Sequence, residues 1–176
     1  MKIVLKNVRL SFPSLFKTED YGGADTGKFA ATFLVPKKDP QIKVIKDALK
    51  KVAEEEFGKP LPKGITNCLK DGDDKDYDGY AGTYSIKAST KRRPTLIDET
   101  KTPIAEEDNK LYAGCYVNVS IDIWAMNNQY GKKVLASLNG IQFAKDGETF
   151  GVSNDSLDDF DAIEAVEETD VDDPFA

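Results

Sequence analysis

Residues 116–126, YVNVSIDIWAM, and the stretch NNQYGKK at 127–133 decide the fold. From Val117 to Ile123 an aliphatic residue occupies every second position, which is the period of a β-strand with one face in a core. The Asn- and Gly-rich stretch predicts a turn into a further strand at residues 134–144, where Gly140 marks a bulge or a barrel corner. A β-hairpin therefore organises this half of the chain.

The same alternation predicts three more strands, at residues 2–10, 28–35 and 82–90. Two segments, 20–27 and 94–110, show no periodicity and are predicted to be loops without regular structure. The strands therefore number five, and long connections separate them.

One amphipathic helix is predicted between the second and third strands. Asp39 and Pro40 are typical of an N-cap and a first helical position, apolar residues then recur at helical spacing, and Gly58 supplies a C-terminal stop. Five strands, one helix and long loops favour a mainly β fold, an OB-fold-like five-stranded barrel, over a sandwich with evenly spaced strands.

The end of the chain differs in charge from everything before it. Ten of the 31 Asp and Glu residues lie in 155–176, a stretch without Lys or Arg, so 21 remain against all 24 Lys and Arg in residues 1–154. The body is thus formally near +3, and the stretch predicts a disordered acidic tail. We expect a nucleic-acid-binding domain at 1–152 and a flexible acidic C-terminal tail at 153–176.

A cationic body joined to a polyanion suggests that the ligand is itself a polyanion, for which the tail competes. A tail that only keeps the protein soluble is the alternative interpretation. No apolar run approaches the roughly 20 residues needed to cross a bilayer, so we expect no membrane association and an intracellular location.

The composition argues against an enzyme. The chain has no His, which removes Ser-His and Cys-His nucleophiles, and Cys68 and Cys115 are expected to be packed thiols. Asp74, Asp76 and Asp78 match the opening of a calcium loop, but the twelfth position is Ser85, so a solvated acidic turn is expected instead. We predict no catalytic residue, no cofactor and no metal; a metal-dependent nuclease using residues 71–78 is the rival hypothesis.

Cations and aromatic residues recur together in the body, which is the chemistry of a site for single-stranded nucleic acid. Phosphates attract cations, and flat rings stack on any base without sequence preference. Ordinary charged turns and rings covered by long loops are the alternatives, and Tyr84 is expected in the core. The predicted nucleic-acid-binding residues are Tyr77, Tyr80, Lys87, Lys91, Arg92, Arg93, Trp124, Tyr130, Lys132 and Lys133.

Three segments carry a resemblance to a known family: KIVLKNVRLSFPSLF at 2–16, the 116–133 hairpin and DVDDPFA at 170–176. With these, the chain resembles the single-stranded-DNA-binding proteins of tailed bacteriophages, in particular the small family that includes the Enc34 phage protein. The resemblance implies an OB fold, sequence-tolerant binding of single strands, and an acidic tail that regulates DNA access and recruits replication partners. Two features depart from it. Relatives commonly end on the aromatic residue itself, whereas here Ala176 follows Phe175. The usual OB order places the helix after the third strand, whereas here it is predicted before that strand.

We therefore expect a non-enzymatic, sequence-nonspecific single-stranded-DNA-binding protein of phage replication, recombination and repair, in the cytoplasm of the bacterial host cell. Its tail is expected to compete with DNA and to bind replication or recombination proteins. Duplex DNA is a further expected ligand once the tail is removed, and a homodimer is compatible with the sequence. A protein-interaction or assembly module with an acidic tail is the second rival. The predicted partner-binding residues of the tail are Asp170, Asp172, Asp173, Pro174 and Phe175.

Overall fold

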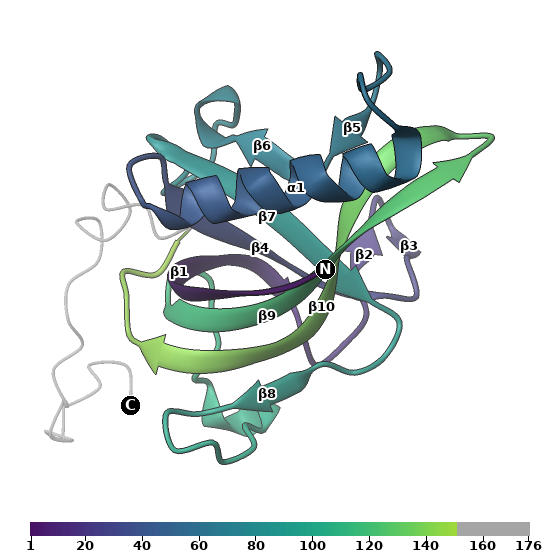
Figure 1. Ribbon diagram of the computed structural model, residues 1–176. Coiled ribbons are helices and arrows are strands. Elements are labelled where there is room, and N and C mark those ends of the chain that lie inside the picture. Colours follow the sequence, from purple (N-terminus) through teal and green to yellow (C-terminus); the bar gives the residue numbers. More distant parts are fainter. Residues whose placement is uncertain (151–176) are drawn as a thin grey trace, which may run out of the picture.

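Five strands form a closed barrel in the computed structural model, which describes residues 1–150 (Figure 1). They are β1 (Lys2–Ser14), β4 (Phe29–Pro36), β7 (Thr83–Thr90), β9 (Tyr116–Asn128) and β10 (Gly131–Lys145). Around the ring β1 pairs with β4, β4 with β7, β7 with β10, β10 with β9 and β9 with β1. Among these five pairings of the ring, β7–β10 alone is parallel, and it joins Ser89 to Ser137. The predicted OB-fold-like barrel is thus confirmed, whereas the predicted tail lies outside the described residues.

Short elements fill the connections that were predicted to be loops. Residues 20–27 contain the β2–β3 ladder, and residues 94–110 contain β8 and η2, so both expectations of irregular structure were wrong. Two- or three-residue strands are too short to show a period, which is why alternation could not find them. The short elements are β2 (Asp20–Tyr21), β3 (Ala24–Asp25), β5 (Thr66–Asn67), β6 (Leu69–Asp71), η1 (Gly72–Asp74), β8 (Thr95–Ile97) and η2 (Glu106–Asp108).

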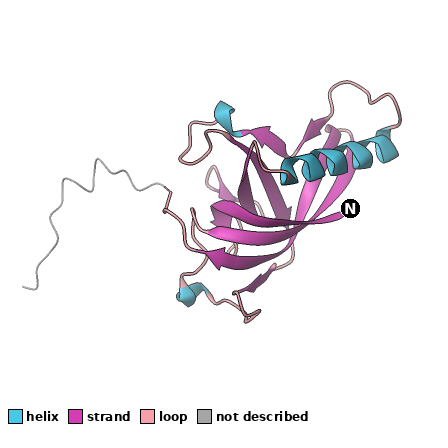
Figure 2. Cartoon of the chain, turned by 60° about the vertical axis from the view of Figure 1, so that its left-hand side comes forward, coloured by secondary structure: helices cyan, strands magenta, loops and turns pink. Residues whose placement is uncertain are grey.

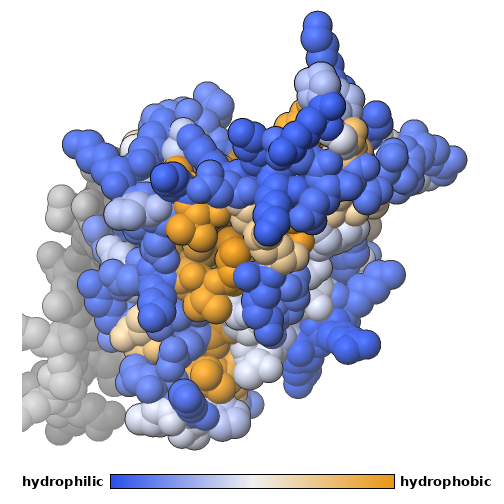
Figure 3. Space-filling view, in the orientation of Figure 1, coloured by the Kyte–Doolittle hydropathy of each residue, from blue (hydrophilic) through white to orange (hydrophobic). Residues whose placement is uncertain are grey.

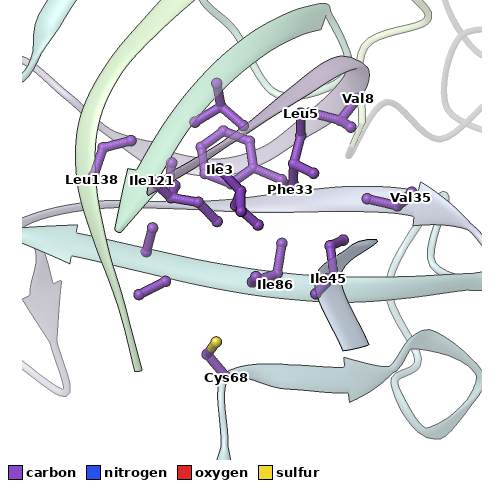
Figure 4. Packing of buried hydrophobic residues seen from close by; sticks show 14 of the residues in the cluster. Ile3, Leu5, Val8, Phe33, Val35, Ile45, Cys68, Ile86, Ile121 and Leu138 are labelled. Carbon is purple, nitrogen blue, oxygen red and sulfur yellow. The ribbon is translucent and has the colours of Figure 1, made fainter. Parts of the chain in front are cut away.

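Inward-facing apolar residues of the five strands fill the barrel (Figure 4). Leu5, Phe33, Ile86 and Ile121 are all fully buried, and each comes from a different strand. The strict alternation is interrupted by shifts of register, one of them in β10 between Leu138 and Gly140, which confirms the predicted bulge. The Cys68 and Cys115 thiols are also buried, as expected, and burial raises the pKa of Cys68 to about 11. Tyr84, which was expected in the core, is partly buried and packs against the outside of this cluster.

A single α-helix, α1 (Gln41–Phe57), lies across one end of the barrel (Figures 1 and 2). Ile42, Ile45 and Leu49 belong to its buried stripe and join the core cluster. The predicted start is displaced by one residue, since Pro40 flanks the helix and Gln41 opens it, but the Asp39 carboxylate still accepts the Gln41 N–H at 2.9 Å. No helix within residues 1–150 is both long and apolar enough to span a bilayer.

The outer face of β1, β9 and β10, below α1, carries a shallow apolar groove. Val4, Ile97 and Ile141 are among its lining residues, and β8 forms one of its sides. Apolar side chains gather on this face in Figure 3. The groove is lined on its remaining sides by Asn, Ser and Gln side chains, without a charged residue.

Replacing Ile45 by Ala should destabilise the protein by about 2 to 5 kcal/mol, because the side chain is fully buried between α1 and the barrel. Val44, the preceding residue, is 51% exposed, so Val44→Ala should change the free energy of unfolding by no more than about 0.5 kcal/mol. Urea unfolding followed by circular dichroism measures both. Equal effects of the two substitutions would contradict the described packing of α1.

Candidate nucleic-acid interface

Polar residues form a row across the outer face of β1, β4 and β7. Since side chains alternate along each strand, Ser11, Thr32 and Lys87 point away from the core. The registers pair Ser11 with Thr32 and Thr32 with Lys87, so the three residues cross the sheet side by side. We call these three residues the polar row. Ser11 itself is buried beneath Tyr80, so the row offers the partly exposed Thr32 hydroxyl and the Lys87 cation on a surface of three paired strands.

Three aromatic rings lie next to this row. The Tyr77 ring is 5.0 Å from Phe12 and 5.2 Å from Tyr80, both in edge-on contacts. The hydroxyl groups of Tyr80 and Ser11 are 2.9 Å apart and share a hydrogen bond, which ties the rings to the polar row. We call Phe12, Tyr77 and Tyr80 the aromatic cluster.

Exposure differs sharply within the aromatic cluster. Tyr80 is only 3% exposed, whereas Tyr77 is 54% and Phe12 is 55% exposed. Burial raises the pKa of Tyr80, and hydrogen bonds with Ser11 and Thr32 oppose that rise. Tyr80 is therefore the floor of the cluster, and the faces open to a ligand belong to Phe12 and Tyr77.

Phe12 was not among the predicted site residues. Its backbone has φ +45°, a left-handed conformation that is a true outlier for a bulky side chain, and it lies where the β1–β4 register shifts between Ser11 and Ser14. A bulge turns a side chain away from the direction that alternation would give it. In the sequence Phe12 continues the alternation of Val8 and Leu10, which would place its ring in the core, so only the register with the partner strand reveals the bulge.

The predicted cations of β7 and its following loop begin in the polar row, with Lys87, and continue past the end of the strand. Lys87 forms an ion pair with Glu19 at 2.8 Å, and Lys91, Arg92 and Arg93 are exposed. In Figure 1 the loop that leaves β7 lies on the same side of the barrel as the β2–β3 ladder. Lys91, Arg92 and Arg93 therefore continue the positive charge of Lys87 past the end of β7.

The remaining predicted residues all belong to the β9–β10 hairpin. Trp124 is 41% exposed and pairs across the strands with Leu135, and Tyr130 at the tip is 75% exposed. Lys133 is paired with Met126, while Lys132 points to the other face, with its ammonium 5.8 Å from the ring of Phe57. Lys132 thus faces α1.

The tyrosines of the loop and the residues of the hairpin lie near opposite ends of α1, and the four cations of β7 and its following loop form a third group. The aromatic cluster is linked to the segment before the helix, because Lys37 pairs with Asp73 of the loop that carries Tyr77. The hairpin approaches Phe57, the last residue of the helix. A helix of this length spans about 25 Å. The structure does not bring all the predicted residues into one tight cluster.

Arg9 holds the last described residues beside the aromatic cluster. Its guanidinium donates to the carbonyl oxygens of Gly114 at 3.0 Å and Glu148 at 2.6 Å, and lies 4.2 Å from the centre of the Phe150 ring. The Phe150 ring in turn occupies the space that a side chain at Gly79 would need. Residue 150 therefore lies close to the loop that carries Tyr77 and Tyr80. Sequence reasoning had not identified Arg9.

The acidic loop does not gather carboxylates around a metal position. Asp71 and Asp73 both pair with Lys37, at 2.8 and 2.5 Å, and this contact lowers the pKa of each carboxyl group. Within residues 1–150 no group of three or more His, Cys, Asp and Glu side chains is placed to hold a metal ion. The arrangement gives the rival nuclease hypothesis no support.

A family model and a curated relative match almost the whole chain. The family model described as Enterobacter phage Enc34, ssDNA-binding protein, matches residues 1–173. The protein p50 of Acyrthosiphon pisum secondary endosymbiont phage 1 is 41% identical over 179 residues, which cover 96% of this chain and 97% of p50.

Solved structures show the same similarity in three dimensions. The single-stranded DNA-binding protein from bacteriophage Enc34 in complex with ssDNA has a TM-score of 0.73 and 31% identity, over 85% of this chain and 89% of that chain. The gp2.5 protein of bacteriophage T7 has a TM-score of 0.60 over 84% of this chain and 93% of that chain, at 13% identity, and so shares the fold alone.

Replacing Tyr80 by Phe should destabilise the free protein by about 1 to 2 kcal/mol, because the buried Ser11 hydroxyl loses its partner. Tyr77→Phe removes the same group from a half-exposed ring and should have almost no effect on unfolding. Thermal or urea denaturation of the two variants compares them directly. A Tyr77→Phe effect as large as that of Tyr80→Phe would contradict the assignment of Tyr80 as the floor.

Proposed function

This chain belongs to the family of the Enterobacter phage Enc34 ssDNA-binding protein, and from that premise we propose that it binds single-stranded DNA without sequence preference. Bases stack on its exposed rings while cations contact the phosphates. The protein thereby coats single strands during phage replication, recombination and repair in the host cell, and performs no catalysis itself.

The observation that carries the proposal is the position of the aromatic cluster. OB barrels bind oligonucleotides on the face of their second and third strands and on the adjoining loops. Those strands are β4 and β7 here, and the polar row crosses both of them next to Phe12 and Tyr77. Two exposed rings beside the Thr32 hydroxyl and the Lys87 cation match the needs of an unpaired strand, whose bases and phosphates are both accessible.

Phosphate contacts are proposed for the cations at the other end of the polar row. Lys87 lies in the row, and Lys91, Arg92 and Arg93 follow it on the exposed loop. Binding releases counterions from the DNA, so affinity should fall as the salt concentration rises. The ion pair of Lys87 with Glu19 exchanges for a phosphate contact when DNA binds.

The β9–β10 hairpin is proposed as a second arm of the interface. It connects the fourth and fifth barrel strands, and the corresponding loop of OB barrels contributes to oligonucleotide binding. Trp124, Tyr130 and Lys133 supply two rings and a cation on it, and Lys132 adds a second cation towards α1. The hairpin would take up bases beyond those on the aromatic cluster.

The acidic tail is proposed to compete with DNA and to bind other proteins. Its attachment supports competition, because Phe150 packs against Gly79, next to the aromatic cluster. Bound DNA would displace the carboxylates and leave the tail available to replication or recombination proteins, and duplex DNA could bind once the tail is removed. The residues proposed to contact such proteins are Asp170, Asp172, Asp173, Pro174 and Phe175.

Truncation after Asn154 should increase affinity for labelled oligothymidine at low salt by on the order of tenfold, because a linked competitor acts at high effective concentration. The gain should shrink as salt rises, since the competition is ionic. Fluorescence anisotropy at several salt concentrations measures both effects.

A matched control keeps the tail at full length and replaces its ten acidic residues by Asn and Gln. This variant should bind like the truncated protein. If the truncated and full-length proteins bind equally at all salt concentrations, tail competition is wrong, although single-strand binding itself would stand.

Replacing Tyr77 by Ala should weaken oligothymidine binding by about 5- to 150-fold, which corresponds to the loss of one stacked base. Trp124→Ala should produce a loss within the same range if the hairpin is a second arm, and binding of DNA should quench Trp124 fluorescence. Val44→Ala, an exposed apolar truncation on α1, serves as the control. Unchanged affinity of the Tyr77 variant would contradict the proposed site.

A further inference from the structure

We infer that Lys37 is a positioning residue that sets the aromatic cluster in place for DNA without touching DNA itself. The inference rests on the proposed single-strand binding and goes beyond it, because it assigns a role to a cation outside the interface. It is carried by the contacts of Lys37 at the base of the loop that bears Tyr77 and Tyr80.

Lys37 follows the last residue of β4 and reaches both ends of that loop. Its ammonium pairs with Asp71 at 2.8 Å and with Asp73 at 2.5 Å, at the start of the loop. Its backbone N–H donates to the carbonyl oxygen of Gly82 at 3.0 Å, at the end of the loop. One residue thus joins the two ends to the barrel.

The carboxylates continue the connection. The second oxygen of Asp73 accepts the N–H of Gly82 at 2.8 Å, so this side chain bridges Lys37 and the far end of the loop. Gly72 lies so close to the carbonyl of Tyr80 and to the side chain of Thr83 that no Cβ would fit. The Thr83 hydroxyl donates to the same Tyr80 carbonyl at 2.7 Å. The loop is therefore closed at its base, and Lys37 is the cation at that closure.

The closed base determines where the rings lie. The backbone N–H of Tyr80 bonds to the carbonyl of Tyr77 at 3.3 Å, so the two residues share one turn. From that turn Tyr80 reaches Ser11 and Tyr77 reaches Phe12, both on β1. A shift of the base would move both rings relative to β1.

The charge at Lys37 argues against a direct phosphate contact. Two carboxylates already surround its ammonium and raise its pKa, and the loop also contains Asp74, Asp76 and Asp78. A phosphate at this position would meet an excess of negative charge. Phosphates are therefore expected along the polar row and its cations, with bases turned toward the loop.

The test compares Lys37→Met with Lys87→Met at several salt concentrations, using labelled oligothymidine. Lys37→Met should weaken binding by nearly the factor lost in Tyr77→Ala, about 5- to 150-fold, with the slope of log affinity against log salt unchanged. Lys87→Met should instead reduce that slope by about 1. Lys38→Met, which alters the neighbouring exposed lysine, is the matched control and should bind normally.

Two additional variants separate positioning from general stability. Lys37→Arg keeps a cation between the two carboxylates and should restore most of the affinity. In the Tyr77→Ala background, Lys37→Met should have little further effect, because the ring that it positions is gone. Hydrogen exchange of the free protein should show faster exchange of the Gly82 and Thr83 amides in Lys37→Met, a readout that needs no DNA.

Three results would overturn the inference: a salt slope that falls by about 1 in Lys37→Met, as expected for a phosphate contact; affinity equal to that of the wild type; or additive losses in the double variant. Failure of the proposed function would look different. In that case the wild-type protein would not bind oligothymidine at low salt, while the exchange experiment would still test the closure of the loop.

Discussion

Closure of the barrel is the constraint on which the other features depend. β7 pairs with β4 on one side and with β10 on the other, so the five main strands have no free position in the ring. Each strand then has one face inside and one outside, and outward residues of neighbouring strands align in rows. Ser11, Thr32 and Lys87 are far apart in the chain but adjacent in one such row. The candidate interface is thus a consequence of how the core is closed.

The sequence predicted the elements that depend on local pattern. The alternation over residues 117–123 appears as alternating burial along β9, because nearby residues alone determine which face is apolar. The predicted stop at Gly58 also appears, because glycine readily adopts the positive φ that ends α1. Elements that depend on a distant partner, or that are too short to show a period, were missed. β8 exists because it pairs with β10, and the ladder of β2 and β3 has only two residues on each side.

The candidate interface shows the same division between residue type and position. Residue type alone predicted Tyr77 and Tyr80 equally as stacking rings, and nothing in the sequence shows that one of them is buried and the other exposed. Ser11, which lies 69 positions away from Tyr80, makes that distinction through a buried hydrogen bond. Phe12 and Arg9 were not predicted for a related reason, since a bulge and a contact with Glu148 and Phe150 both require the folded chain. The separation of the predicted site residues between the loop that carries Tyr77 and Tyr80 and the β9–β10 hairpin is also visible only in the folded structure.

If Phe12 stacks on DNA as proposed, its left-handed backbone places protein stability and DNA binding in opposition. Holding a bulky residue at φ +45° costs on the order of 1 to 3 kcal/mol, and glycine at the same position would be free of that cost. The half-exposed ring recovers little of it by burial in the free protein. Laboratory selection for heat resistance alone would therefore favour glycine at position 12 and discard the ring, while selection for DNA retention would keep the strained aromatic residue.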